Sequence, residues 1–258
     1  MSSSFVRNVA YGILDLLTFK KGIARNINGM KIRFTPKWSR YFPSDYESDN
    51  YEFLKVKLKE GMQVIDIGAH IGLFSVYTSQ LTGPTGKVIC FEPTPDTFAI
   101  LKETIRLNHC KNIIPKQEAV GASCGTATFY ISNTFEGCNA NSLVLNKKEA
   151  NGYDVTITTL DTICHDHDIR PDLVKIDAEG AELDVLKGGK QTLTTTKPLV
   201  ILGLHPSFIQ TKGDSLKEIW DLIKSYGYKV IYEGATITEN NFISQPHLFD
   251  VHLVPSTT

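Results

Sequence analysis

Val64-Ile-Asp-Ile-Gly-Ala-His-Ile-Gly-Leu-Phe74 joins an apolar run to a turn that contains two glycines. The run ends in Asp66-Ile-Gly68 and passes directly into a second apolar segment, which predicts a strand, a tight turn and a helix. Gly68 and Gly72 have no Cβ, so the backbone can approach a ligand closely. Free N–H groups at the start of the helix favour an anionic group such as a carboxylate or a phosphate. The segment therefore predicts a site for a nucleotide-type cofactor.

The acid in this turn separates the site from dinucleotide-binding proteins. Their fingerprint requires Gly-x-Gly-x-x-Gly, whereas this turn has Asp66 where the fingerprint has its first glycine. A second apolar run, 87–92, ends in Glu92, and one βα unit separates the two acids. Doubly wound sheets place a ribose-binding acid at this offset. Together the two acids indicate S-adenosylmethionine, although Glu92 taken alone could also be a surface charge at a strand end.

Three further acids follow a third apolar run, in Val174-Lys-Ile-Asp177-Ala-Glu179-Gly-Ala-Glu182. Ligands of open α/β sheets bind outside the carboxyl ends of the strands, so Asp66, Glu92 and Asp177 are expected to converge at one edge. Carboxylates there suit a cofactor that carries a sulfonium cation, an ammonium group and a ribose. Glu179 and Glu182 have an alternative role, the stabilisation of a helix N-terminus, worth about 0.3–1 kcal/mol each.

The alternation of apolar runs and helical patterns predicts an α/β fold, with a parallel sheet covered by helices on both faces. An inserted antiparallel hairpin, 126–132 and 154–159, is expected after the third core strand, where apolar and polar residues alternate. A polar, Asn-rich loop separates its two strands. The other expected strands are 30–34, 64–67, 87–92, 113–117, 173–176, 199–204, 229–232 and 249–253. The expected helices are 45–58, 96–108 with Asp96 as N-cap, 181–193 and 215–226.

With 258 residues and 41% hydrophobic content, the chain can bury one substantial core, and this size favours one large domain over two. We expect residues 1–52 to form a short helical and stranded extension packed on the core, and residues 53–258 to form the cofactor-binding domain. Apolar residues recur at helical spacing from Phe5 to Leu17, which predicts an amphipathic helix. Packing on the protein is its expected role, and contact with a membrane surface is the alternative.

Composition narrows the partners. The formal net charge of −1 and the lack of a Lys/Arg-rich run argue against a nucleic-acid substrate. Five cysteines without Cys-x-x-Cys spacing indicate neither a disulfide framework nor a zinc site, and we expect no metal at His165-Asp-His-Asp168, which favours a solvated loop. No apolar run reaches the roughly 18 residues of a membrane span. We expect a cytoplasmic protein without stable membrane insertion; the sequence carries no signal for its oligomeric state.

Six motifs occur in order along about residues 60–205: 64–72 with Phe74-Ser75, Phe91-Glu-Pro-Thr-Pro95, Ala119-Val-Gly121, Thr159-Leu-Asp161, Lys175-Ile-Asp-Ala-Glu-Gly-Ala-Glu182 and Leu186-Lys-Gly188. Through these motifs the chain resembles the FkbM family of S-adenosylmethionine-dependent methyltransferases. The resemblance implies a Rossmann-like, seven-stranded methyltransferase sheet. It also implies methylation of a hydroxyl oxygen on a small-molecule, sugar, glycolipid or polyketide acceptor.

Two positions depart from the family pattern. His70 stands where many relatives have Asn, which should be tolerated because the backbone makes the contacts there. Gly203-Leu-His205-Pro206 replaces an acid-containing end of the fifth strand, so the catalytic base is in question. We expect His205 to be the base, with Asp177 and Glu179 as the other catalytic candidates. The alternative is that His205, beside Pro206, only shapes the acceptor pocket or caps the strand. The expected cofactor-binding residues are Asp66, Gly68, Ala69, His70, Ile71, Gly72, Glu92, Pro93, Glu118, Ala119 and Asp177.

Other functions use the same sheet. A methyltransferase that acts on a nitrogen acceptor would keep the cofactor site, but in nucleic-acid enzymes of this kind an Asn/Asp-Pro-Pro-aromatic string usually follows strand four. Here that position reads Asp177-Ala-Glu-Gly180. A nicotinamide-dependent oxidoreductase would need the missing glycine fingerprint. A protein that binds the cofactor without catalysis is a third alternative.

Overall fold

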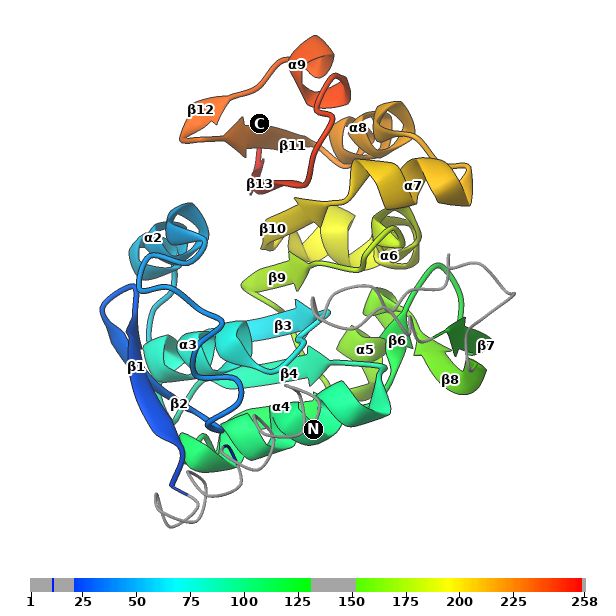
Figure 1. Cartoon of the computed structure of the whole chain (residues 1–258). Helices are drawn as coiled ribbons and strands as arrows, with labels where there is room; N and C mark the ends of the chain where they lie inside the picture. Colours follow the sequence, from blue (N-terminus) through cyan, green and yellow to red (C-terminus); the bar gives the residue numbers. More distant parts are fainter. Residues whose placement is uncertain (1–10, 12–20, 131–151, 257–258) are drawn as a thin grey trace, which may run out of the picture.

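The computed structural model describes residue 11 and residues 21–130 and 152–256 of the chain. Its centre is an eight-stranded sheet in the order β12-β11-β13-β10-β9-β3-β4-β5 (Figure 1). These strands are β3 (Gln63–Ile67), β4 (Lys87–Phe91), β5 (Ile113–Lys116), β9 (Leu173–Ile176), β10 (Leu199–Leu204), β11 (Tyr228–Tyr232), β12 (Ala235–Thr236) and β13 (Phe249–Pro255). The expected α/β sheet class is confirmed, but this sheet has eight strands where seven were expected.

The strand order creates a switch point between β3 and β9. From β3 the chain adds β4 and β5 on one side, and it then returns to add β9 and β10 on the other side, all in parallel. β13 pairs antiparallel with both β10 and β11. Open α/β sheets bind ligands outside the carboxyl ends of the strands at such a switch point. The topology thus places the ends of β3 and β9 side by side at the position where a ligand is expected.

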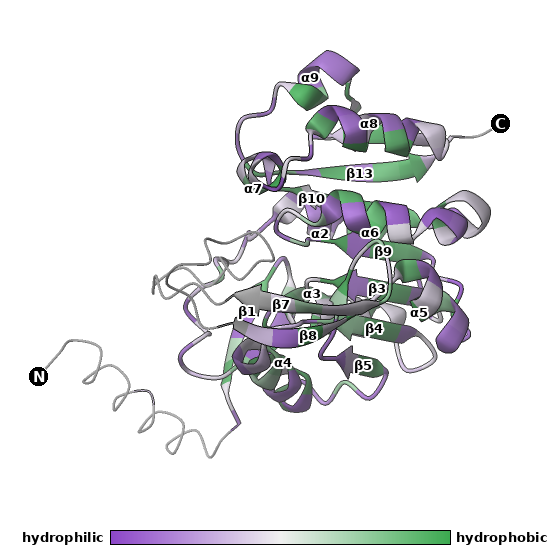
Figure 2. Ribbon diagram, turned by 90° about the vertical axis from the view of Figure 1, so that its right-hand side faces the viewer, coloured by the Kyte–Doolittle hydropathy of each residue, from purple (hydrophilic) through white to green (hydrophobic). Residues whose placement is uncertain are grey.

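Two apolar layers cover the two faces of the sheet, and the core strands are buried on both sides. Val64 faces one layer and its neighbour Ile65 faces the other. The first layer comes from the hairpin β1 (Ile23–Ile27) and β2 (Met30–Phe34), together with α2 (Ser48–Lys57), α3 (Leu73–Thr82) and α4 (Pro95–Leu107). The second layer comes from α5 (Leu160–Asp166), α6 (Glu182–Gly188), α7 (Pro206–Lys212), α8 (Leu216–Ser225) and α9 (Glu239–Ile243). Figure 2 shows the central strands as mainly hydrophobic and the outer helices as mixed.

The predicted antiparallel pair is present as β7 (Gly125–Tyr130) and β8 (Gly152–Thr158). It forms a separate small sheet with β6 (Ala119–Val120), in the order β6-β8-β7, beside the main sheet. The Asn-rich loop between its strands lies outside the described residues, and so does the expected helix at 5–17. The division of the chain at residue 52 stays a prediction. Within the described ranges, none of the helices combines the length and the apolarity that crossing a membrane requires.

Three predicted helices differ from the structure at their ends, and α2 begins at Ser48, three residues later than expected. Thr94, not Asp96, is the N-cap of α4, because Pro95 takes the first helical position, where its lack of an N–H costs nothing. The helix expected over 181–193 ends at Gly188. A Cβ at Gly188 would lie 2.1 Å from the carbonyl oxygen of Gly121, so this close approach requires glycine. A π-helical turn, η1 (Thr192–Thr196), follows.

Candidate active site

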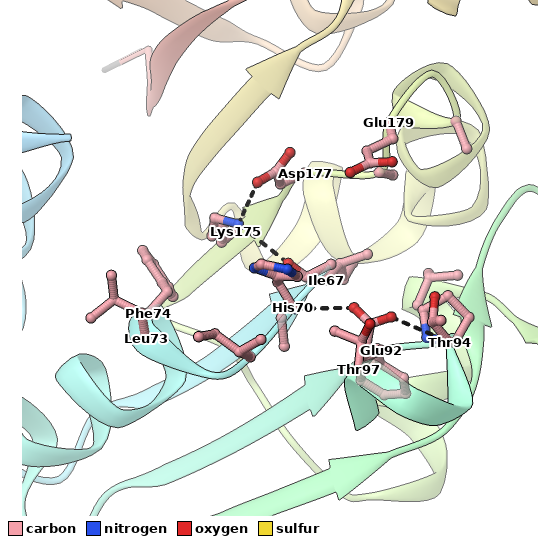
Figure 3. Close-up of a pocket in the computed structure, with 18 of the residues that line it drawn as sticks. Ile67, His70, Leu73, Phe74, Glu92, Thr94, Thr97, Lys175, Asp177 and Glu179 are labelled. Atoms are coloured by element: carbon pink, nitrogen blue, oxygen red, sulfur yellow. Dashed lines mark hydrogen bonds and ion pairs between the residues drawn. The ribbon is translucent and has the colours of Figure 1, made fainter. Parts of the chain in front are cut away.

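One pocket lies at the carboxyl ends of β3, β4, β9 and β10 (Figure 3). Most of the site residues predicted from the sequence line it. These are Gly68, Ala69, His70, Ile71, Glu92, Pro93, Glu118, Ala119, Asp177, Glu179 and His205. Phe42, Tyr46, Glu47, Leu248 and Asp250 add walls from the segment before α2 and from the region of β13. The fold therefore assembles the pocket from both ends of the described chain.

Asp66 and Gly72 do not line the pocket. Asp66 is fully buried, and its Oδ2 accepts a hydrogen bond of 2.5 Å from Ser75 on α3. Burial raises the pKa of its carboxyl against the opposing charge of Lys175. Gly72 has a φ of +90°, and a Cβ there would lie 2.6 Å from Leu101 on α4. Both residues thus lie outside the pocket lining, and their predicted contact with the cofactor stays a prediction.

The turn after β3 requires Gly68 for a steric reason. Its φ is +79°, and a Cβ would lie 1.8 Å from the carbonyl oxygen of Asp177. The backbone at the end of β9 thus passes directly against this turn. His70 also has a positive φ, +49°, and its ring packs edge-on against Trp38 at 5.7 Å. Burial lowers the pKa of His70 to about 4, so its imidazole is neutral at physiological pH.

Glu92 is anchored by backbone N–H groups. It is 7% exposed; Oε2 accepts from the N–H of His70 at 3.0 Å and Oε1 accepts from the N–H of Thr94 at 2.9 Å. Burial raises the pKa of the carboxyl and these hydrogen bonds oppose the rise. A carboxylate has about four lone-pair sites, so each oxygen can still accept from a ligand. The geometry suits a group with two adjacent hydroxyls.

Lys175 and Asp177 form an ion pair at the end of β9. The Lys175 Nζ lies 2.8 Å from Asp177 Oδ2 and 3.5 Å from the carbonyl oxygen of Gly68. Burial acts to raise the pKa of Asp177, but Lys175 and His205 outweigh it and the pKa falls below its usual range. Asp177 therefore stays ionised and is a weak proton acceptor.

His205 is held between two carboxylates. Its Nδ1 lies 2.9 Å from Oε1 of Glu182, and its Nε2 lies 3.7 Å from Oδ1 of Asp177. Glu182 has no exposed surface and also accepts from the N–H of Gly180 at 3.0 Å. Burial acts to lower the pKa of His205, but the Glu182 hydrogen bond and the Asp177 charge outweigh it, and the pKa rises. An ionised Glu182 only accepts, so it fixes the proton of the neutral ring on Nδ1 and leaves a lone pair on Nε2.

Glu182, which contacts His205, and Asp250, which lines the pocket, are two residues that the predicted set of site residues did not include. Glu182 stood in the Lys175 to Glu182 motif, but a charge at a helix start explained it equally well. Asp250 on β13 lies opposite Gly203 on β10, where a Cβ would be 3.0 Å from Asp250 Oδ1 and 3.3 Å from Asp177 Oδ1. Burial, then Glu47 and Asp177, raise the pKa of Asp250 to about 6. Only the antiparallel pairing of β13 brings this acid to the pocket.

Within the described ranges, no group of three or more His, Cys, Asp and Glu side chains is arranged to hold a metal ion. His165 and Asp166 belong to the last turn of α5, not to a loop, and their mutual contact at 2.9 Å is exposed.

The open sheet with its pocket at the switch point has the architecture of a Rossmann-like methyltransferase. A family model described as "Methyltransferase FkbM domain" matches residues 66–230. The chain therefore belongs to the FkbM methyltransferase family, whose members depend on S-adenosylmethionine, and the predicted resemblance is confirmed. The match favours methyl transfer over the nicotinamide-dependent alternative.

Two curated relatives and one solved structure add detail. Methyltransferase sdnD of Sordaria araneosa is 27% identical over 188 residues, which cover 60% of this chain and 71% of sdnD. Hexuronic acid methyltransferase AglP of Haloferax volcanii is 29% identical over 215 residues, which cover 78% of this chain and 84% of AglP. The crystal structure of a putative rRNA-methylase from Clostridium thermocellum aligns with a TM-score of 0.50 at 12% identity, over 82% of this chain and 96% of that one. That likeness concerns the fold alone.

Proposed function

We propose that this protein transfers the methyl group of S-adenosylmethionine to a hydroxyl oxygen of a sugar, glycolipid, polyketide or other small-molecule acceptor. The observation that carries the proposal is the Glu182–His205 pair at the end of β10, which presents the Nε2 of a histidine to the pocket. A hydroxyl is a weak acid, so its oxygen gains from a positioned base as it attacks. A sugar acceptor agrees with the activity named for AglP.

The pocket suits S-adenosylmethionine on its own geometry. Glu92, fixed by two backbone N–H groups, would accept hydrogen bonds from the two ribose hydroxyls. Backbone from Gly68 to Ile71, with Glu118 and Ala119, would line the rest of the cofactor site. Pocket carboxylates would balance the positive charge of the ligand. When bound, the cofactor supplies an electrophilic methyl group.

His205 acts as the base in this proposal, because the carboxylates of Glu182 and Asp177 orient its ring and stabilise its protonated form. Its Nε2 accepts the proton of the acceptor hydroxyl, while its Nδ1–H continues to donate a hydrogen bond to Glu182. The resulting imidazolium is then stabilised by Glu182 and Asp177. Asp177 itself is too weak a base because Lys175 holds its pKa low. Asp177 is therefore assigned to charge stabilisation and positioning.

Transfer of a labelled methyl group from S-adenosylmethionine to a panel of glycans, lipids and polyketides tests the proposal. The wild-type protein should label an acceptor that has a free hydroxyl, and blocking that hydroxyl should abolish labelling. His205→Ala should bind S-adenosylhomocysteine normally and lose about a hundredfold or more in rate. Labelling of an amine alone, or an unchanged rate in His205→Ala at saturating acceptor, would contradict the proposal.

A further inference from the structure

Glu179 lines the pocket with a buried side chain and an unusual backbone conformation. It lies three residues beyond Ile176, the last residue of β9, and its φ is +46°, a left-handed conformation that is uncommon outside glycine. Its Oε2 is buried and has no hydrogen-bond partner among the described residues. The next residue, Gly180, has a φ of +101°, and a Cβ there would lie 2.8 Å from Phe208. The backbone is thus held so that Glu179 lines the pocket with an unsatisfied oxygen (Figure 3).

Acids surround this carboxyl. Asp177 and Glu182 come from the same segment, and Glu92 comes from the end of β4. Lys175 is the cation that opposes them, but it is already paired with Asp177 at 2.8 Å. The other charged or titratable groups that line the pocket are Tyr46, Glu47, Tyr51, His70, Glu118, His205 and Asp250. The negative charges of these neighbouring acids therefore disfavour ionisation of Glu179.

Burial, followed by the charges of Asp177 and Glu92, raises the pKa of Glu179 to about 9. At pH 7.5 the group is thus a neutral carboxylic acid before any ligand binds. In that state the carboxyl cannot accept a proton, and its predicted catalytic role stays a prediction. A neutral acid beside a cofactor site can respond to the charge of the ligand, because a nearby positive charge favours the ionised form of the acid.

We infer that Glu179 is a charge-responsive group of the cofactor site: it is neutral before binding and gives up its proton to solvent when a sulfonium-bearing cofactor occupies the pocket. The inference rests on the proposed function, since it requires that S-adenosylmethionine binds here. The ionised Glu179 then lies as a counter-charge to the bound sulfonium. S-adenosylhomocysteine has a neutral thioether at that position, so it should lower the pKa of Glu179 less.

The size of the effect follows from ordinary electrostatics. An opposite charge within about 4–6 Å lowers the pKa of a carboxyl by about 1 to 3. A fall from about 9 to between about 6 and 8 would release roughly 0.2 to 0.9 proton for each S-adenosylmethionine bound at pH 7.5. The same linkage would increase the preference for S-adenosylmethionine over S-adenosylhomocysteine by about 3- to 200-fold at pH 8.5. Glu179 would thereby help the protein to reject its own product.

Titration calorimetry of the whole chain in two buffers of different ionisation enthalpy measures the proton release. The titrants are S-adenosylmethionine and S-adenosylhomocysteine, each at pH 7.5 and pH 8.5. Wild type should release protons with S-adenosylmethionine and fewer with S-adenosylhomocysteine. Glu179→Gln should no longer release this proton when it binds S-adenosylmethionine. Its affinities for S-adenosylmethionine and S-adenosylhomocysteine should therefore differ less than those of wild type. Glu52→Gln, an exposed acid outside the pocket, is the matched control and should behave like wild type.

A second variant guards against a folding defect in the first. Glu179→Gly suits the left-handed backbone and also lacks the carboxyl, so it should lose the release as well. Equal proton release in wild type and both variants would overturn the inference, but it would not contradict the proposed binding of S-adenosylmethionine. Failure of wild type to bind S-adenosylmethionine at all would instead contradict the proposed function.

Discussion

Glu182→Gln is the substitution that most sharply tests the assignment of His205 as the base. Glu182 has no exposed surface, and its carboxylate accepts from His205 Nδ1 at 2.9 Å and from the N–H of Gly180 at 3.0 Å. Glutamine keeps the shape and removes the charge. The imidazolium that forms when His205 takes a proton then loses its fully buried counter-charge. The variant should therefore slow proton abstraction without changing the cofactor site.

The expected loss follows from the strength of that interaction. A hydrogen bond to a charged group contributes about 1.5–3 kcal/mol. Since about 1.4 kcal/mol changes a rate tenfold, kcat should fall by roughly ten- to a hundredfold. The pKa of His205 should also fall, because the Glu182 hydrogen bond is what raises it against burial. The acid limb of the pH–rate profile should accordingly move to lower pH in Glu182→Gln.

The assay is single-turnover methyl transfer from pH 5 to pH 9, together with calorimetry of S-adenosylhomocysteine binding. Asp184→Asn is the matched control, because Asp184 lies on the same helix but pairs with Lys212 at 2.7 Å outside the pocket. It should keep the wild-type profile. If Glu182→Gln retained both kcat within twofold and the acid limb, His205 would not act through Glu182 and the assigned base would be wrong.

Three further substitutions test other parts of the account. Glu92→Ala should weaken S-adenosylmethionine binding by about ten- to a hundredfold, as calorimetry would show, because a charged hydrogen bond is worth about 1.5–3 kcal/mol; unchanged affinity would refute the ribose contact. His70→Asn removes a buried neutral imidazole with a pKa of about 4. Wild type should therefore lose up to about 3 kcal/mol of unfolding free energy relative to this variant as pH falls from about 6.5 to about 4. If chemical denaturation gave the same pH dependence of the unfolding free energy for both proteins, this prediction would be wrong. Gly68→Ala should prevent stable folding, whereas Gly29→Ala, whose φ is also positive but whose Cβ would meet nothing within 4 Å, should cost only about 1 kcal/mol.

The elements that the sequence predicted well are those with a strong local signal. β9 and β10 match their predicted ranges, because strands buried at the centre of a sheet are mainly apolar runs, interrupted in β9 by Lys175 alone. α8 begins where Ser215 and Glu218 form a capping box. Some missed elements had a local signal, such as α5 with its N-cap Thr159, but others have little. The exposed, two-residue β12 is an example, since it forms only because β11 offers it an edge.

The same distinction holds for the candidate site. Glu92 and Asp177 were found because each acid directly follows an apolar strand. Asp66 satisfies the same pattern, yet its carboxylate turns to Ser75 on α3, which no strand pattern reveals. Asp250 reaches the pocket only through the register of β13 against β10. Sequence patterns located the edge of the sheet that carries the site, whereas side-chain direction depended on tertiary packing.

A crystal structure of the protein with S-adenosylhomocysteine is the most direct measurement of the central claim. The account predicts that both ribose hydroxyls bond to the Glu92 carboxylate, and that the thioether sulfur lies at the end of the pocket where Asp177 and His205 meet. A nucleoside bound elsewhere, or a sulfur remote from His205 with Glu92 still bonded only to the backbone, would contradict it.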